Sequence, residues 1–301
     1  MQRYGLALSF LLLCAALTLL SDRFLTVDNM VNVLKQSTIN GIIAVGMTFV
    51  ILTAGIDLSV GSILALSTIV SADMMQKGVA VPAAVGIGLA LGALLGLVNG
   101  LVITKARVPP FVATLGMMTI ARGLALTYSQ GRPITGLPDS FRFIAKGSIG
   151  PIPMPILIMA LVYIVNWIIL NRTFIGQYIY ALGNNPVAAR YAGINVDRYT
   201  SFVYVLAGFL SALAGMILIA RLNSAQPTAG LAYEFDAIAA VVVGGTSFAG
   251  GEGGLGGTLL GVLVIAVLNN GLNLLNVPSF YQPVVTGVVI ALALLVYKAV
   301  R

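Results

Sequence analysis

The stretch that decides the fold is Gly253–Tyr297, GGLGGTLLGVLVIAVLNNGLNLLNVPSFYQPVVTGVVIALALLVY, in which 45 consecutive residues carry no charge. A helix needs about 20 mainly apolar residues to cross the hydrocarbon core of a bilayer. The stretch is therefore long enough for two membrane-spanning helices. Pro278 and Pro283 interrupt the helical pattern, so we expect the turn between the two helices at 276–282.

The composition of the whole chain is that of a membrane protein. Of its 301 residues, 59% are hydrophobic and 8% are charged, whereas a soluble domain carries about 25% charged residues. So few charges cannot cover a water-exposed surface of ordinary size, which excludes soluble enzymes and nucleic-acid-binding proteins. The 16 basic and 9 acidic residues give a net charge of +7. They are scattered without a run suited to a polyanion, so we expect contact with membrane lipid and none with nucleic acid.

The missing residue types limit the chemistry of the chain. Histidine is absent, and the only cysteine, Cys14, lies in an apolar run. Histidine-based catalysis, zinc sites and intramolecular disulfides are therefore excluded. We predict no metal site and no catalytic residue, and we expect a protein that is not an enzyme.

Charged residues divide the chain into uncharged stretches, most of them about as long as one membrane span. Counting them predicts an all-α membrane protein of about ten transmembrane segments in a single domain, residues 1–301. The first stretch lacks the cleavage site of a signal peptide and is interpreted as a retained helix. The third and eighth stretches are shorter than a full span. The expected segments are 4–21, 36–56, 58–72, 78–104, 108–128, 147–171, 199–220 and 237–250, with two more in 253–297.

The number of basic residues on each side of the membrane does not decide the orientation of the chain. With the N-terminus inside, eight would lie inside and seven outside, a balance at which the positive-inside rule decides nothing. The compact turn that holds Lys105 and Arg107, together with the basic C-terminus, favours an inside N-terminus. Because ten segments is an even number, both termini would lie on the same side.

Four short motifs recur in the same order at offsets of 169 to 175 residues. The offset spans five helices, an odd number, so the second half of the chain would be inverted relative to the first. We therefore predict a five-helix inverted repeat with halves at about 39–128 and 201–299, in which the short third and eighth segments correspond. Many transporters place their pathway at the interface of such halves. The matching pairs are 46–47 with 215–216, 53–55 with 228–230, 99–101 with 270–272 and 108–109 with 277–278.

An acidic residue lies in the loop before the third segment. Asp57 is the only charge between Lys35 and Asp73, and Ser59 and Ser62 follow it closely. A charge within the membrane is costly and usually faces a cavity or a partner, which favours a place on a translocation path. Alternatively, Asp57 or Ser59 caps the helix of the third segment.

Amide side chains occur inside otherwise apolar segments. They are Asn99, Asn269, Asn270 and Asn273, of which the last two lie three residues apart and share a helix face. Amides can donate hydrogen bonds to sugar hydroxyls and accept them without binding the sugar tightly, which suits a path that must release its cargo. The alternative is hydrogen bonding between helices.

The longest polar stretch, residues 171–200, contains a short capped helix. Asn185 suits the N-cap, Pro186 the first helical position and Gly193 the position after the C-cap. A helix this short is unstable alone, so it is either an interfacial helix on the membrane or a docking site for a cytoplasmic partner. Its contact residues would be a small-residue face of Ala188, Ala189 and Ala192, with Arg190 and Tyr191 beside it.

The residues of this helix follow a Gly-x-Asn-x-x-Ala-Ala-x-x-x-Gly-Ile pattern from Gly183 to Ile194. With it, nearly the whole chain resembles the integral permeases of ATP-binding-cassette (ABC) importers of the ribose type. The resemblance implies a permease of a type II-like importer, in which this helix is the cytoplasmic coupling helix that grips an ATPase subunit. The implied coupling residues are Asn184, Asn185, Pro186, Ala188, Ala189, Arg190, Tyr191 and Gly193. The resemblance also covers Gly55-Ile-Asp-Leu-Ser-Val-Gly61, Ser224-Ala-Gln-Pro-Thr-Ala-Gly230, Gly244-Gly-Thr-Ser-Phe-Ala-Gly-Gly251 and Asn269-Asn-Gly-Leu-Asn-Leu-Leu275.

The resemblance further implies the surroundings of the chain. It predicts a prokaryotic inner-membrane protein with cytoplasmic termini and a cytoplasmic coupling loop at 171–200. Two copies of the permease would form the translocation path at their interface. The permease itself would bind no cofactor, because ATP and Mg²⁺ would be held by the partner ATPase, as two chains or one fused pair. An extracytoplasmic sugar-binding protein would deliver a monosaccharide, with ribose as the first choice.

Three basic residues are expected on the outer side of the membrane. They are Arg132, Arg142 and Lys146, in the polar stretch between the fifth and sixth segments. We predict that they pair with carboxylates of the sugar-binding protein when it docks.

A rival interpretation is an ion-coupled secondary transporter. It would couple sugar entry to protons or sodium through Asp57, Glu234 and Asp236. It requires all three carboxylates within the membrane, whereas the last two flank the eighth segment in the predicted arrangement.

Overall fold

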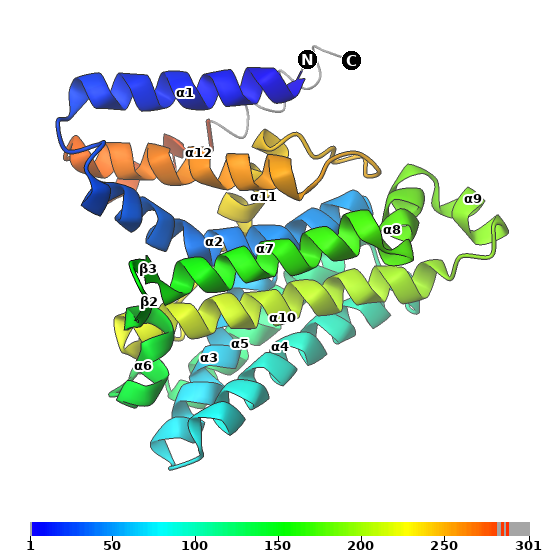
Figure 1. The fold of residues 1–301 in the computed structure, drawn as a ribbon. Coiled ribbons are helices and arrows are strands. Elements are labelled where there is room, and N and C mark those ends of the chain that lie inside the picture. The colour runs from blue at the N-terminus through cyan, green and yellow to red at the C-terminus, as the bar shows by residue number, and fades with distance from the viewer. Residues whose placement is uncertain (1, 282–283, 286, 289–301) are drawn as a thin grey trace.

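The computed structural model describes residues 2–281, 284–285 and 287–288, and most of them are helical. The long helices lie side by side and run roughly along one common axis, which lies across the view in Figure 1. Among the described residues, six helices are long and apolar enough to cross a membrane, so the prediction of an all-α membrane protein is confirmed. These six are α2 (Val27–Leu52), α4 (Val81–Thr104), α5 (Pro110–Ser129), α7 (Met154–Arg172), α10 (Val196–Leu222) and α12 (Leu255–Leu274).

Shorter elements complete the described chain. Two antiparallel strand pairs join β1 (Ile134–Thr135) to β4 (Ser224–Ala225) and β2 (Ser148–Ile149) to β3 (Ile152–Pro153). A 3₁₀ turn, η1, spans Ser279–Tyr281. The remaining helices are α1 (Gln2–Leu20), α3 (Val60–Gln76), α6 (Asp139–Lys146), α8 (Phe174–Asn184), α9 (Pro186–Tyr191) and α11 (Tyr233–Val243).

A helix occupies each of the first nine expected segments, while the tenth lies largely outside the described residues. The boundaries are wrong where a charge was taken as the end of a segment. α2 begins at Val27 instead of residue 36, although Asp28 and Lys35 lie inside it. Thr26 caps it by accepting a hydrogen bond from the Asn29 backbone N–H, and Asp28 lies in the first turn, where a negative charge is favourable.

One further boundary is wrong, and one helix was not predicted. The eighth segment was expected to continue to residue 250, but α11 ends at Val243, and Gly245 follows with a φ of +86°. In the stretch 171–200 the predicted short helix is present as α9, and α8, which was not predicted, precedes it. One face of α8 is buried through Ile179 and Leu182, so packing against the bundle stabilises this helix.

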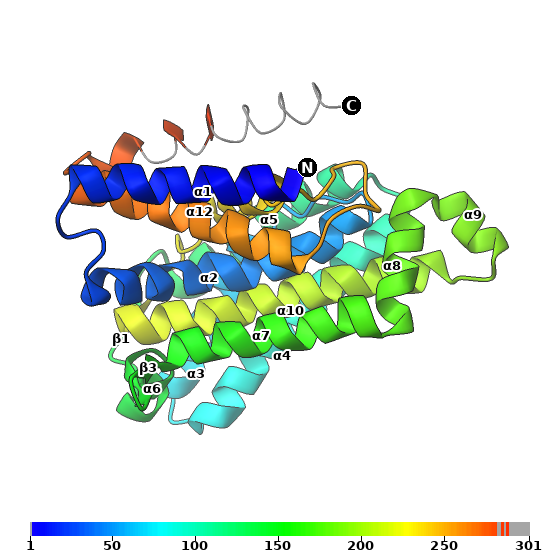
Figure 2. The same cartoon turned by 45° about the horizontal axis from the view of Figure 1, so that its top comes forward.

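The two ends of the helix bundle differ in structure. We call one the α6 end, which carries α6 and the β2–β3 hairpin, and the other the α9 end, which carries α8 and α9 (Figure 1). The N-terminus lies towards the α9 end in Figures 1 and 2. α1 lies along α12 in both views and packs against it.

α10 and α2 are the central helices of the bundle. α10 contacts α2, α3 and α4, whereas α2 contacts α10, α11, α12 and α7. Glycines make the contact between α4 and α10 close, because a Cβ at Gly92 or Gly208 would meet the backbone of the other helix. These contacts bury most of α2 and α10, so the polar residues that they carry lie inside the protein.

Candidate functional site

Three of the predicted path residues form a buried hydrogen-bond network at the start of α3. Asp57 Oδ1 accepts hydrogen bonds from the Ser59 backbone N–H at 2.8 Å and from its hydroxyl at 2.6 Å. Asn99 Nδ2 on α4 donates to Ser59 Oγ at 2.9 Å. Ser59 occupies the N-cap position of α3, but no side chain accepts a capping hydrogen bond from the first turn; the Asp57 carboxylate instead accepts from the N–H of Ser59 itself. Asp57 Oδ2 is buried and has no hydrogen-bond partner among the described residues.

The first turns of α3 and α11 meet at this network. A Cβ at Gly61 of α3 would overlap the carbonyl oxygen of Gly230, which precedes α11, and one at Gly230 would lie 2.7 Å from Gly61 O. Ser62 and Glu234 are buried beside this contact. The two short helices therefore face one another with their N-terminal ends.

Arg122 of α5 holds the loop that leads to α11. Its Nη1 donates hydrogen bonds to the backbone carbonyl oxygens of Pro227, at 2.6 Å, and Ala229, at 2.8 Å. A cation that contacts two carbonyl dipoles is stabilised where an isolated charge would be costly. This loop, the Asp57 network and the Gly61–Gly230 contact form one packed junction.

Asn270 lies away from this junction and connects two helices. Its side-chain amide forms a reciprocal pair with Asn29 of α2, with N···O distances of 2.9 and 3.0 Å. The pair ties the beginning of α2 to the end of α12. For Asn270 the geometry therefore agrees with hydrogen bonding between helices.

Replacing Asn270 with leucine should lower the free energy of unfolding by about 1 kcal/mol, because the Asn29 amide loses its partner. Thermal denaturation in detergent should show the loss as a lower Tm. The Asn29→Leu/Asn270→Leu double variant should be less destabilised than the sum of the two single variants. Strict additivity would show that the two amides do not interact in the protein.

Asn269 and Asn273 line a cavity of about 430 Å³ between α2, α10, α11 and α12. Its other polar residues include Asn40, whose Nδ2 donates to Asp236 Oδ2 at 3.2 Å. Asn40 is not among the site residues predicted from the sequence, and Asp236 was predicted only in the ion-coupled alternative. The contact between them joins residues 196 positions apart.

The predicted capped helix is present as α9. Asn185 Oδ1 accepts hydrogen bonds from the backbone N–H groups of Val187 and Ala188, both at 3.0 Å. Gly193 follows the C-cap with a φ of +83°. Asn184, the last residue of α8, donates to the backbone of that helix, and Pro186, Ala188, Arg190 and Tyr191 are exposed.

The small-residue face of α9 is only partly available to a partner. Ala189 is buried, with 5% of its surface exposed, because it faces the protein. Ala188 and Ala192 remain exposed, and Tyr191 is 90% exposed. The exposed surface of α9 is therefore narrower and more aromatic than the sequence suggested.

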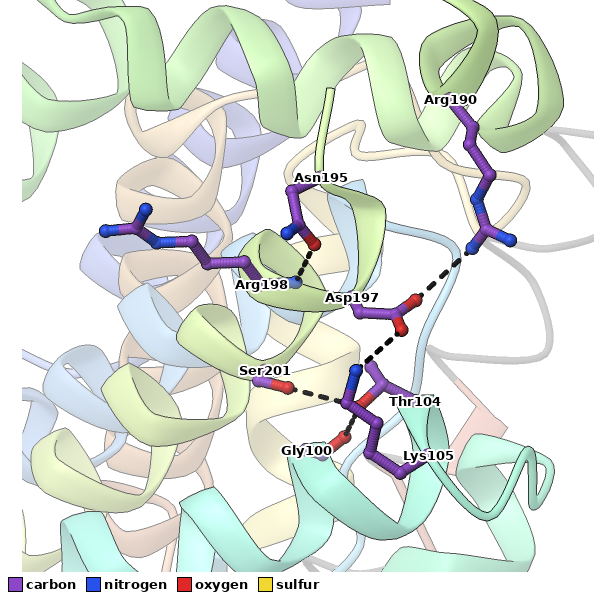
Figure 3. Close-up of polar contacts among 8 residues, drawn as sticks. All are labelled: Gly100, Thr104, Lys105, Arg190, Asn195, Asp197, Arg198 and Ser201. Atoms are coloured by element: carbon purple, nitrogen blue, oxygen red, sulfur yellow. Dashed lines mark hydrogen bonds and ion pairs between the residues drawn. The ribbon is translucent and has the colours of Figure 1, made fainter. Parts of the chain in front are cut away.

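Asp197, in the first turn of α10, anchors α9 to the rest of the bundle. Its carboxylate lies between two cations (Figure 3): Arg190 Nη2 at 3.2 Å from Oδ1, and Lys105 Nζ at 3.1 Å from Oδ2. Thr104 also approaches Ser201, with a hydroxyl–hydroxyl distance of 3.3 Å. Each exposed ion pair contributes at most about 1 kcal/mol, but together they define where α9 sits relative to α4 and α10.

Sequence reasoning missed Asp197 and Lys105. The available signal was that Asp197 is the only acidic residue in 171–200, a stretch that also holds Arg172, Arg190 and Arg198. Its second partner, Lys105, is 92 residues away in sequence and could not be assigned without the fold.

The residues predicted to meet a binding protein lie in the α5–α7 connection, which includes α6. Arg132 and Lys146 are exposed. Arg142 instead pairs with Asp139 at 2.9 Å, and its Nε is buried without a hydrogen-bond partner among the described atoms. Arg142 is therefore less available to a partner than the other two residues.

Comparison with known proteins places the chain in a family. It matches the family described as "Branched-chain amino acid transport system / permease component" over residues 29–294. The ribose import permease protein of Bacillus subtilis is 52% identical over 297 residues, which cover 98% of this chain and 92% of that protein. The ribose import permease protein of Haemophilus influenzae is 50% identical over 298 residues, with the same coverage. The D-allose transport system permease protein of Escherichia coli is 40% identical over 290 residues, which cover 95% and 88%.

The chain therefore belongs to this family of transport-system permeases, as the sequence resemblance predicted. It is a multi-pass protein of a bacterial inner membrane, and it is a transport subunit, so the prediction that it is not an enzyme is confirmed. No solved structure gives a significant match to the chain.

Proposed function

We propose that the chain is the transmembrane permease of an ATP-driven ABC importer for a monosaccharide, with ribose as the sugar. The observation that carries the proposal is the similarity to ribose import permeases, at 50–52% identity over 96–98% of the chain. The 40% identity to a D-allose permease is lower, which favours ribose over that hexose. The comparisons give no support to the rival ion-coupled transporter.

In the proposed importer, α9 is the coupling helix for the ATPase subunit. Most of its residues are exposed, and it is capped at both ends. Its residue Arg190 forms an ion pair with Asp197 of α10, which fixes the position of the helix. The partner would supply the ATP and Mg²⁺ sites and the hydrolysis, and movement of its nucleotide domains would displace α9. This arrangement places the α9 end and the N-terminus on the cytoplasmic side. The α6 end then faces outward, where the sugar-binding protein would dock on Arg132 and Lys146.

The proposal includes the five-helix inverted repeat in a single domain, with α2–α5 in the first half and α10–α12 in the second. The helix contacts support it, because a two-fold relation pairs α2 with α10, α3 with α11 and α4 with α12. α10 packs against α3 and α4, and α2 packs correspondingly against α11 and α12. The contact between α3 and α4 likewise has a counterpart between α11 and α12. Including the tenth segment, about ten segments would then cross or enter the membrane, and two permeases would assemble as a homodimer.

The decisive experiment is purification of the tagged permease from its native membrane in a mild detergent, with mass spectrometry of the proteins that remain bound. We expect a stoichiometric ABC ATPase, and ribose uptake by the reconstituted complex should require ATP and the binding protein. Uptake by the permease alone that stops when the ion gradient is dissipated would overturn the proposal. It would instead assign coupling to Asp57, Glu234 and Asp236.

A further inference from the structure

The cavity between α2, α10, α11 and α12 has the size and position of a small-molecule site. Its volume of about 430 Å³ lies within the range of about 300–1,000 Å³ that is typical of such sites. Its lining residues on α2 lie between Asn32 and Asn40, so none comes from the last twelve residues of that helix. Arg221, in the last turn of α10, also lines it. The cavity therefore occupies the half of the bundle towards the α6 end.

Two of the polar groups that line the cavity offer hydrogen-bond acceptors to a ligand. Asp236 is a carboxylate that already accepts one hydrogen bond from Asn40. Asn269 Oδ1 is buried and has no hydrogen-bond partner within the described part of the chain. A buried acceptor without a partner is costly, and a hydroxyl group of a ligand would satisfy it. The Asp236 carboxylate disfavours an anion beside it; Lys35 and Arg221 also line the cavity.

Towards the α9 end, close helix contacts end the cavity. The hydroxyl groups of Thr48 on α2 and Thr258 on α12 form a hydrogen bond of 2.7 Å. A Cβ at Gly261 of α12 would overlap the carbonyl oxygen of Ala240 on α11. Three of the four helices that line the cavity therefore pack directly on one another beyond it. A molecule that enters from the α6 end passes Asn40, Asp236 and Asn269 and stops beside Ala240 and Val262, which also line the cavity.

We infer that this cavity is a low-affinity binding site for a neutral monosaccharide, contained within one permease protomer. The inference rests on the proposed function for the identity of the cargo. It differs from the expected path at the homodimer interface, because it lies between four helices of the same protomer, α2, α10, α11 and α12. It also separates the roles of the predicted path residues. Asn269 and Asn273 contact the sugar, whereas Asp57, Ser59, Asn99 and Asn270 hold helices together.

The test uses the full-length permease in lipid nanodiscs, without ATPase or binding protein, and D-ribose as the probe. Saturation-transfer NMR should detect saturable binding with a Kd in the millimolar range. Asn269→Leu should weaken it about three- to tenfold, the effect of one lost hydrogen bond. Asn166→Leu is the matched control: this α7 asparagine is buried and has an Oδ1 without a partner among the described residues, but it does not line the cavity.

Two further variants distinguish loss of the binding site from a folding defect. Ala266→Phe should fill the cavity and abolish the ribose signal, while Val264→Phe, on the same helix but outside the lining, should retain it. D-ribose 5-phosphate should bind more weakly than ribose. Equal ribose binding by wild type and Ala266→Phe, or tighter binding of the phosphate, would overturn the inference.

The reconstituted importer distinguishes a failure of this inference from a failure of the proposed function. If the wild-type permease binds no ribose although ATP-driven uptake is intact, the inference falls and the function stands. If the permease binds ribose at this cavity but uptake follows an ion gradient, the proposed function falls and the site stands.

Discussion

Gly193→Pro is expected to reduce ATP-driven uptake at least about tenfold while the permease still folds. Gly193 has a φ of +83°, and its N–H donates to the carbonyl oxygen of Arg190 at 3.0 Å. Proline fixes φ near −65° and has no N–H, so the last turn of α9 cannot close. No described atom lies within 4 Å of a Cβ at this position, so the change disturbs the turn and not the packing around it. The measurement is uptake together with the amount of ATPase that co-purifies with the permease.

Gly150→Pro is the matched control for this variant. Gly150 lies in the β2–β3 turn at the α6 end, has a φ of +60°, and has no described neighbour within 4 Å of a Cβ. The control makes the same substitution away from α9, so the amount of ATPase that co-purifies with this variant should equal that of the wild type. Normal uptake and a normal ATPase yield for Gly193→Pro would show that α9 is not the coupling helix.

Gly61→Ala should destabilise the permease by about 1–3 kcal/mol, a typical cost of forcing an extra methyl group into a packed interior. The new methyl group would overlap the Gly230 carbonyl oxygen and approach Glu234. Neither helix can retreat easily, because both belong to the junction that also holds the Asp57 network. The yield of monodisperse protein and its Tm in detergent measure the effect.

Gly116→Ala is the matched control, since it makes the same change in the helix α5. A Cβ at Gly116 has no described neighbour within 4 Å. Alanine favours a helix over glycine by up to about 1 kcal/mol, so this variant should be neutral or more stable. Equal stability of the Gly61 and Gly116 variants would contradict the close contact between α3 and α11.

Local chemistry explains which parts of the fold could be predicted from the sequence. The caps of α9 depend on Asn185, Pro186 and Gly193, which lie close together in the chain, and they are present as predicted. Most long helices were located because an uncharged run of spanning length has few alternatives. α8 was missed because its stability comes from packing of Ile179 and Leu182 against the bundle, which composition does not report.

The candidate site was less predictable because its contacts join distant parts of the chain. Asn29 pairs with Asn270 across 241 residues, and Asn40 with Asp236 across 196. Asn269 and Asn270 are chemically identical neighbours, yet one faces a cavity and the other a partner amide. Helix rotation decides between these environments, and in a segment that is apolar on most sides the sequence contains little information about rotation.

The glycine contact between α4 and α10 also has a mechanical consequence. With little side-chain material between them, the two helices cannot slide or tilt independently without backbone collision, so they behave as one stiff rod. α10 has 27 residues, which makes the rod about 40 Å long at 1.5 Å per residue. One end of this rod is tied to α9 through Asp197 and Lys105, so in the proposed importer a force that displaces α9 would act on α4 and α10 together. Because α4 and α10 move as one unit in this arrangement, we expect such a force to tilt both helices, with the largest displacement at the end far from α9.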